Sequence, residues 1–298
     1  MKDIGKILLY LIATVLLGAL LAPALFWGAH ALTDRIANQR LIQFLAETDF
    51  QRFFNRAVLI SAFVLLWPLV RSLRIRNFFD DLGLARDRRR WRHLATGLFI
   101  AITTMILLGA VLVWTDCYYL KKQVPWEKLA WLLPTAFSVA IIEELLFRGG
   151  IQGVVQRSVT DDFALIFVAA LFAIVHFLRP EENVVASNAV TWKSGYALVP
   201  HAFWQFEQPQ LLLGGFTTIF LLGLLLGYTR CRTRSLWMPI GLHAGFILGK
   251  MSFSKMTKRT AEAWPWFGPD ILVGLGPVIV LLVVGIIIWL LLRNEEAR

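Results

Sequence analysis

The sequence has few cysteines and few charged residues for its length. Cys117 and Cys231 are the only two cysteines among 298 residues, which is too few for a disulfide framework, and their separation matches no metal-ligand spacing. Asp, Glu, Lys and Arg together make up 17% of the chain, whereas hydrophobic residues make up 57% and the mean hydropathy is +0.63. This composition argues against a soluble fold and places the chain in a lipid bilayer.

The charge that is present has one dominant sign. Lys and Arg number 30 against 20 Asp and Glu, which gives a net charge of +10. In so apolar a chain this excess belongs in loops that face anionic lipid rather than on a surface that binds nucleic acid. We therefore expect the bilayer, and no nucleic acid, as the partner of these basic residues.

Long apolar segments predict an all-α fold, a polytopic bundle of about eight transmembrane helices. A span needs about 20 mostly apolar residues to cross a hydrocarbon core roughly 30 Å thick. The segments that meet or approach this length are residues 6–32, 57–73, 93–114, 129–150, 162–178, 210–229, 236–250 and 271–292. The length of the first apolar run favours a membrane anchor over a cleaved signal peptide.

Two segments between the spans have an interfacial character. Residues 33–56 alternate apolar and charged positions at roughly helical spacing, which predicts an amphipathic helix in the membrane interface. Residues 179–208 are polar in places and rich in aromatic side chains, which indicates an interfacial loop that anchors the chain or acts as a lid.

Basic residues between the spans predict the orientation. With the N-terminus inside, a small majority of them lie on the cytoplasmic side, including the dense run in residues 71–92 and the turn at residues 230–234. We expect both termini in the cytoplasm and the protein in the cell membrane. Cys117 and Cys231 then lie on opposite faces and cannot form a disulfide. The sequence leaves the oligomeric state open.

Small residues recur at four-residue intervals on two of the predicted spans. Gly241, Gly245 and Gly249 form one such ladder, and Gly223 with Gly227 forms another. Such spacing predicts helices whose backbones approach closely.

Ionisable residues inside predicted spans are the strongest functional signal. Glu143, Glu144 and Arg148 lie near the end of the fourth span, His176 ends the fifth, and His243 is in the middle of the seventh. Placing such a group in hydrocarbon costs at least about 2.5–3.5 kcal/mol, so these side chains should face the bundle interior and find partners. They predict a polar cavity within the membrane, lined by three helices.

Helical geometry distinguishes the two glutamates. Glu144 and Arg148 are four residues apart and share a helix face, whereas Glu143 is rotated by about 100° from Glu144. Arg148 can therefore neutralise Glu144 and leave Glu143 available to the cavity. The alternative is that Glu144 and Arg148 form a simple ion pair at the membrane surface.

Three short motifs carry a family resemblance. Residues 142–149 (IEELLFRG), 172–176 (FAIVH) and 243–245 (HAG) resemble the E-E-x-x-x-R, F-x-x-x-H and H-x-x-x-N motifs of the CPBP family. That family comprises intramembrane endopeptidases and includes the CAAX prenyl protease 2 enzymes and bacteriocin-immunity relatives. The resemblance implies a catalytic core at residues 129–250, between N-terminal transmembrane helices (1–128) and a C-terminal loop and last helix (251–298).

The resemblance also implies a role for each site residue. Glu143 would activate the attacking water with help from His176, Glu144 and Arg148 would support Glu143, and His243 would stabilise the oxyanion. The family's Asn falls at Ile247, which cannot donate a hydrogen bond. Another donor would have to replace it, with Asn183, Asn188, Ser252 or a backbone N–H as candidates, or the chain is slow or inactive.

The sequence is compatible both with a metal-dependent and with a metal-free site. Glu143, His176 and His243 would make a three-ligand zinc site with an open fourth position, as in metalloproteases. The H-E-x-x-H spacing that places two ligands on one helical turn is missing, and a metal-free mechanism is equally acceptable.

The sequence thus predicts an endopeptidase that cleaves a membrane-associated protein or peptide. No Ser or Cys lies beside Glu143 or His176 in the chain, which favours an activated water over a covalent acyl-enzyme. The alternative is an inactive or weak relative that acts as a membrane scaffold or immunity factor. A proton-coupled transporter would explain buried Glu and His residues but not the paired motifs.

Overall fold

The computed structural model describes residues 2–33, 48–73, 82–84, 88–181, 184–261 and 263–293. Helices dominate these residues, which confirms the predicted all-α fold. The chain divides into two compact units, each made of two stretches. The first consists of Met1–Ile75 and His176–Gln208, and the second of Arg76–Val175 and Pro209–Arg298.

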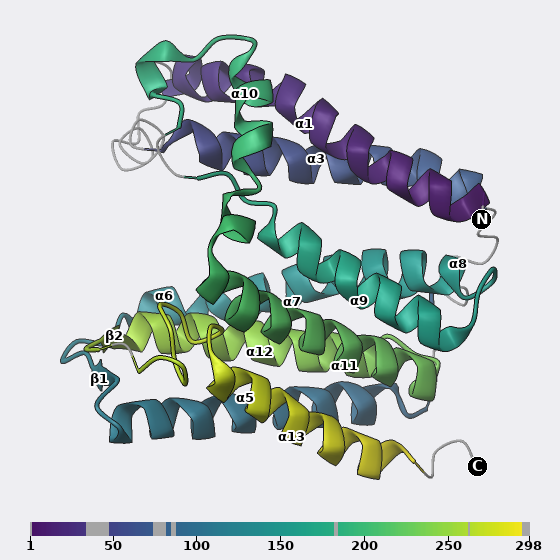
Figure 1. Ribbon diagram of the computed structural model, residues 1–298, viewed down its shortest axis with the longest axis vertical. Coiled ribbons are helices and arrows are strands. Elements are labelled where there is room, and N and C mark those ends of the chain that lie inside the picture. Colours follow the sequence, from purple (N-terminus) through teal and green to yellow (C-terminus); the bar gives the residue numbers. More distant parts are fainter. Residues whose placement is uncertain are drawn as a thin grey trace. The chain divides into compact units, whose positions relative to one another are not determined.

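The first unit is built on a pair of long helices. Helices α1 (Lys2–Thr33) and α3 (Phe50–Ser72) run side by side, and α10 (Ser194–His201) packs against α1 (Figure 1). Aromatic side chains fill the interface, with Phe26 at 5.7 Å from Phe50 and 5.4 Å from Phe53 between ring centroids. Residues 34–47, which hold most of the predicted amphipathic helix, lie outside the described residues.

The segment at residues 179–208 is more ordered than the sequence suggested. It contains α10 and two 3₁₀ turns, Ser187–Ala189 and Trp204–Glu207. Gly195 lies so close to the backbone of Ala19 that a Cβ atom there would overlap the carbonyl oxygen, and Trp192 packs edge-on against Trp27. The prediction of a loop is therefore wrong for the helix α10, which is packed on α1, whereas the interfacial position of the segment stays a prediction.

The second unit holds the remaining helices and a small hairpin. Its elements are α5 (Arg90–Trp114), β1 (Tyr118–Leu120), α6 (Trp126–Ala130), α7 (Leu132–Glu144), a π-helical turn η1 (Leu145–Gln152), α8 (Gly153–Val155), α9 (Asp161–Phe177), a second π-helical turn η4 (Leu211–Phe216), α11 (Thr217–Thr233), α12 (Trp237–Met256), β2 (Thr257–Arg259) and α13 (Leu275–Leu292). The last two residues of α9 belong to the first unit.

Among the described residues, five helical segments are long and apolar enough to cross a membrane. They are Asp3–Leu32, Phe50–Ser72, Arg90–Trp114, Leu211–Thr233 and Leu275–Leu292, and each corresponds to a predicted span. The other three predicted spans are helical but do not meet the same criterion within the described residues. Helix α7 has 13 residues and α9 has 17, so the number of eight spans is not confirmed.

The glycine ladder on α12 packs against α5, as its spacing predicted. A Cβ atom on Gly241 would lie 3.0 Å from the carbonyl carbon of Leu94, and one on Gly245 would lie 2.6 Å from the Cβ of Ala101. Gly223 on α11 faces α9 in the same way, 3.0 Å from the Cα of Ala169. Small residues thus set the distance between these helix pairs.

Replacing Gly241 with alanine is expected to destabilise the protein by about 1–3 kcal/mol, because the added methyl group meets backbone atoms of α5 that cannot move independently. Gly285→Ala on α13 is the matched control, since a Cβ atom there meets nothing within 4 Å. Thermal unfolding of the two purified variants in the same detergent checks this. Equal melting temperatures would show that the α5–α12 contact tolerates the methyl group.

The hairpin joins the far ends of α5 and α12. Strands β1 and β2 are antiparallel, with Tyr119 opposite Lys258. The side chain of Lys121 extends this contact, because its Nζ donates to the carbonyl oxygens of Ser254 at 3.3 Å and Lys255 at 3.0 Å. The chain then returns through residues 260–274 to the start of α13, with residue 262 outside the described part.

Candidate active site

The helix that carries the first motif changes its geometry at the motif. Helix α7 ends at Glu144, and the next eight residues form the π-helical turn η1. A π turn widens the helix and is common at functional sites. Gly149, within η1, packs closely, since a Cβ atom on it would lie 3.1 Å from the carbonyl oxygen of Leu82. The predicted span at residues 129–150 is therefore helical but changes from α to π geometry at its C-terminal end.

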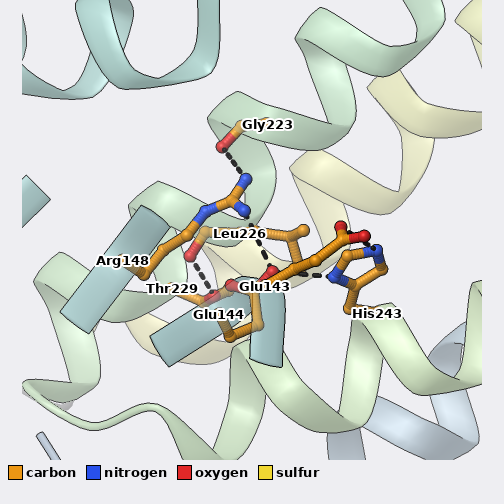
Figure 2. Close-up of polar contacts among 7 residues, drawn as sticks. All are labelled: Glu143, Glu144, Arg148, Gly223, Leu226, Thr229 and His243. Atoms are coloured by element: carbon orange, nitrogen blue, oxygen red, sulfur yellow. Dashed lines mark hydrogen bonds and ion pairs between the residues drawn. The ribbon is translucent and has the colours of Figure 1, made fainter. Parts of the chain in front are cut away.

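Arg148 and Glu144 form the predicted ion pair, and protein encloses it. Arg148 Nη1 donates to Glu144 Oε1 at 2.9 Å, and both side chains are 0% exposed. Nη2 of Arg148 donates to the carbonyl oxygen of Gly223 on α11 at 3.3 Å (Figure 2). The alternative of an exposed pair at a helix end is therefore wrong, because Arg148 is held inside the helix bundle of the second unit.

Phe172 on α9 covers this pair. The guanidinium carbon of Arg148 lies 4.2 Å from the centroid of the Phe172 ring, which is cation–π geometry. The same ring packs edge-on against Phe147 at 5.1 Å and against His243 at 5.8 Å. The Phe of the second motif therefore shields the buried charges, a role that the sequence did not indicate.

His243 lies between the two glutamates. Its Nδ1 is 2.7 Å from Glu144 Oε1, and its Nε2 is 3.7 Å from Glu143 Oε2. Figure 2 shows the imidazole ring with one carboxylate at each nitrogen. When Nδ1 carries a proton it donates to Glu144, the partner of Arg148, and this bond fixes the orientation of the ring. Glu144 thus supports His243 as well as pairing with Arg148.

Glu143 differs from Glu144 in its exposure. Its side chain is 27% exposed, whereas those of Glu144 and His243 are 0% and 4% exposed. The distance of 3.7 Å from its Oε2 to His243 Nε2 is longer than a direct hydrogen bond, and this oxygen is itself buried, so the exposed part of the side chain lies elsewhere. Glu143 is therefore the accessible acid of the cluster, as helical geometry predicted.

His176 and Ile247 are the other positions that the motifs single out. His176 follows Phe172 by four residues, so both lie on one face of α9, but His176 belongs to the first compact unit. Its assistance to Glu143 stays a prediction. Ile247 follows His243 by one turn of α12 and is half-buried, so an aliphatic side chain occupies the position of the family's Asn.

Three side chains are candidates to replace that Asn. One of them lies on α12 with His243, and the other two do not belong to the described part of the second unit. Ser252 is nine residues beyond His243, about 180° around the helix, so it lies on the opposite face. Asn188 is exposed in a 3₁₀ turn of the first unit, and Asn183 lies outside the described residues. Asn183, Asn188 and a backbone N–H therefore stay predictions.

Gln152 is a further buried polar residue that sequence reasoning missed. It is 0% exposed, and its Nε2 donates to the carbonyl oxygen of Gly227 at 3.2 Å and contacts Cys231 Sγ at 3.1 Å. Glu144, Arg148 and Gln152 follow one another at intervals of four residues, and this spacing is the signal that could have identified it. Cys117 and Cys231 are both free thiols.

The candidate zinc ligands are divided between the two units. Glu143 and His243 lie together in the second unit, and His176 belongs to the first. Across the described ranges, no group of three His, Cys, Asp or Glu side chains is arranged to hold a metal ion. A zinc site made of these three residues therefore stays a prediction. The contact between His243 Nδ1 and Glu144 would orient the ring equally well for binding zinc or for metal-free catalysis.

Together the fold and the site define a class of protein. The second unit combines apolar helices long enough to span a membrane with a buried Arg–Glu–His cluster and one partly exposed glutamate, and this is a combination found in integral membrane proteins with an internal polar site. Residues 125–248 match the family model described as type II CAAX prenyl endopeptidase, Rce1-like. The chain thus carries an Rce1-like domain, which confirms the resemblance to the CPBP family.

A curated relative matches over a similar length. It is the uncharacterized protein YyaK of Bacillus subtilis (strain 168), which is 24% identical over 147 residues. The match covers 47% of this chain and 47% of the relative, so the chain spans about half the length of that protein. No solved structure matches.

Proposed function

We propose that this protein is an intramembrane endopeptidase that hydrolyses a peptide bond of a membrane-associated protein or peptide. The observation that carries the proposal is the pairing of an accessible carboxylate, Glu143, with an imidazole whose other nitrogen is fixed by a buried ion pair. A carboxylate beside an oriented imidazole is suited to activating water and stabilising the developing charge. The Rce1-like domain supports the same reaction class.

In the proposed reaction Glu143 acts as the general base. It removes a proton from a water molecule while the water oxygen attacks the carbonyl carbon of the scissile bond, with His176 assisting. With a proton on both ring nitrogens, His243 donates from Nδ1 to Glu144 and from Nε2 to the oxyanion. Glu143 then returns the proton to the leaving nitrogen as the C–N bond breaks. Rates of cleavage of a membrane-tethered peptide by the wild type and Glu143→Gln test this directly.

The substrate class is a further proposal. The matching family model describes CAAX prenyl endopeptidases, and unprenylated peptides or membrane-protein tails are the other candidates for this chain. A farnesylated peptide and the same peptide on an unprenylated lipid anchor distinguish them. We propose the cell membrane as the site of action, with both termini in the cytoplasm.

A zinc ion held by Glu143, His176 and His243 would polarise the substrate carbonyl and lower the pKa of a bound water. Elemental analysis of the purified protein distinguishes this zinc-dependent mechanism from the metal-free one. Stoichiometric zinc that is lost in His243→Ala supports the metal site, whereas full activity after chelation supports the metal-free reaction.

The substitution Ile247→Asn is expected to raise the rate of hydrolysis by about tenfold or more, because it restores a hydrogen-bond donor one turn from His243 on the same helix face. Initial rates with one membrane-tethered substrate check this, and Ile247→Leu is the matched control. A rate that Ile247→Asn leaves unchanged would indicate that a backbone N–H already serves the oxyanion.

Ile247 also favours a second candidate function, that of a membrane scaffold or immunity factor without hydrolysis. The two functions differ in their dependence on Glu143. A biological activity that persists in Glu143→Gln supports the scaffold, and one that is lost supports the endopeptidase.

A further inference from the structure

The second unit gathers arginine residues at one end of its helix bundle, the end opposite the hairpin (Figure 1). Two contacts define this end. Trp91 at the start of α5 packs on Trp237 at the start of α12, with ring centroids 5.7 Å apart. Arg232 near the end of α11 donates to the carbonyl oxygen of Arg293, just after α13, at 3.4 Å. The described arginines at or beside these helix ends are Arg88, Arg89, Arg90, Arg92, Arg230, Arg232, Arg234 and Arg293.

Exposed tryptophans lie among these arginines. Trp91 is 61% exposed and Trp289 is 51% exposed. The guanidinium carbon of Arg90 lies 5.3 Å from the centroid of the Trp91 ring, and that of Arg293 lies 6.0 Å from the Trp289 ring. Tryptophan is enriched at the level of the lipid headgroups. This end of the bundle therefore suits the headgroup level of a membrane, where lipid phosphates are the abundant anions.

Arg230, in the last turn of α11, packs against a glycine of another segment. A Cβ atom on Gly83 would lie 2.8 Å from Cζ and 2.9 Å from Nη2 of Arg230. Gly83 also has a φ of +81°, so both its conformation and the space filled by the guanidinium favour glycine. Its carbonyl oxygen accepts from the backbone N–H of Leu236 at 2.8 Å. The backbone of Gly83 is thus fixed beside the guanidinium of Arg230.

Arg230 is partly buried and has no acidic partner in the described part of the chain. Its side chain forms no ion pair and no hydrogen bond with the described residues, and its Nε is buried. A charge that is withdrawn from water is costly unless an opposite charge compensates it. The planar guanidinium matches the oxygens of a phosphate group. At the headgroup level, a lipid phosphate is therefore the anion that suits Arg230.

The segment under Arg230 also reaches the helix of the active site. Leu82, which precedes Gly83, is 3% exposed and packs on Gly149 in η1. A Cβ atom on Gly149 would lie 3.1 Å from the carbonyl oxygen of Leu82. The turn η1 carries Arg148 of the buried ion pair. A ligand that holds Arg230 on Gly83 would therefore also hold this segment against η1.

We propose that Arg230 binds the phosphate of an anionic membrane lipid, at a site that it forms with Gly83. The neighbouring arginines supply the positive potential that concentrates such lipids, and Arg230 supplies the specific contact. The bound phosphate provides the counter-charge of the guanidinium and stabilises the second unit. This binding does not depend on the proposed hydrolysis.

Thermal unfolding of the full-length protein in a neutral detergent tests this, because a ligand of the folded state raises its melting temperature. The probes are phosphatidylglycerol, phosphatidylcholine with the same acyl chains, and inorganic phosphate. Phosphatidylglycerol should raise the melting temperature of the wild type by about 5 °C at saturation, and the other two probes should leave it unchanged. Arg230→Gln should abolish the rise. Arg293→Gln removes the same charge from an exposed position at the same end, and it should retain the rise.

Hydrogen–deuterium exchange of the wild type locates the binding without any substitution. Phosphatidylglycerol should slow the exchange of backbone amides at residues 82–84 and 145–152. Unchanged exchange at residues 82–84 overturns the inference, and so does an equal loss of stabilisation in Arg230→Gln and Arg293→Gln, which would indicate attraction to a charged surface without a site. Equal stabilisation by phosphatidylcholine or by inorganic phosphate overturns the choice of an anionic lipid.

Discussion

Substitution of Glu143 by glutamine is expected to slow peptide hydrolysis by between about 10² and 10⁴, the range that a general base contributes. Glutamine keeps the size of the side chain and its contact with His243 but cannot accept the proton of the attacking water. Because the Glu143 side chain is 27% exposed and Glu144 holds the buried ion pair, the variant should fold normally. Initial rates with a membrane-tethered substrate, at equal amounts of folded protein, measure the effect.

Glu127→Gln provides the matched control for that experiment. Glu127 lies on α6 in the same unit, and its side chain is exposed. It should retain the wild-type rate. Equal rates for the wild type and Glu143→Gln would remove Glu143 from the reaction and leave the scaffold function as the better account.

Substitution of Glu144 by glutamine is expected to destabilise the protein by about 3–5 kcal/mol, the usual effect of removing one partner of a buried ion pair. Arg148 is the largest fully buried side chain among the described residues, and it would keep its charge without the carboxylate to which it is hydrogen-bonded. His243 would lose the acceptor that orients it. Unfolding of the purified variant by heat or denaturant measures the loss.

The double variant Glu144→Gln, Arg148→Met identifies the cause of the destabilisation by Glu144→Gln. Methionine removes the buried charge and can still pack against the ring of Phe172, which lies over the guanidinium. We expect the double variant to be more stable than Glu144→Gln alone. Equal stability would mean that the lost bond to His243, rather than the unpaired charge, accounts for the destabilisation.

Local spacing was sufficient to predict much of the site. Four-residue separation predicted the Glu144–Arg148 ion pair, and the same spacing of glycines predicted the close approach of α12 to another helix. Both predictions depend only on the helical repeat, which a sequence displays directly. The Rce1-like match at residues 125–248 agrees with the order of the three motifs.

Features that depend on distant segments could not be predicted in this way. The hydrogen bond from His243 to Glu144 joins residues 99 positions apart, and nothing in the spacing of either helix specifies it. The π turn after Glu144 includes Gly149, which packs against Leu82, and the sequence around the motif reveals neither the turn nor this contact. The packing of α10 on α1 was missed because polar and aromatic residues in a connecting segment also suit a membrane interface.

One oxygen atom, Glu144 Oε1, accepts hydrogen bonds from both Arg148 and His243, while Arg148 also bonds the carbonyl of Gly223. The Glu144–Arg148 pair therefore links four helical segments, α7, η1, α11 and α12, and we expect its residues to be needed for assembly whether or not the protein is an enzyme. A homologue that had lost its chemistry would keep Glu144, Arg148 and His243 and be free to change Glu143. Among related sequences, the residue at position 143 should separate hydrolytic members from those that only retain the fold.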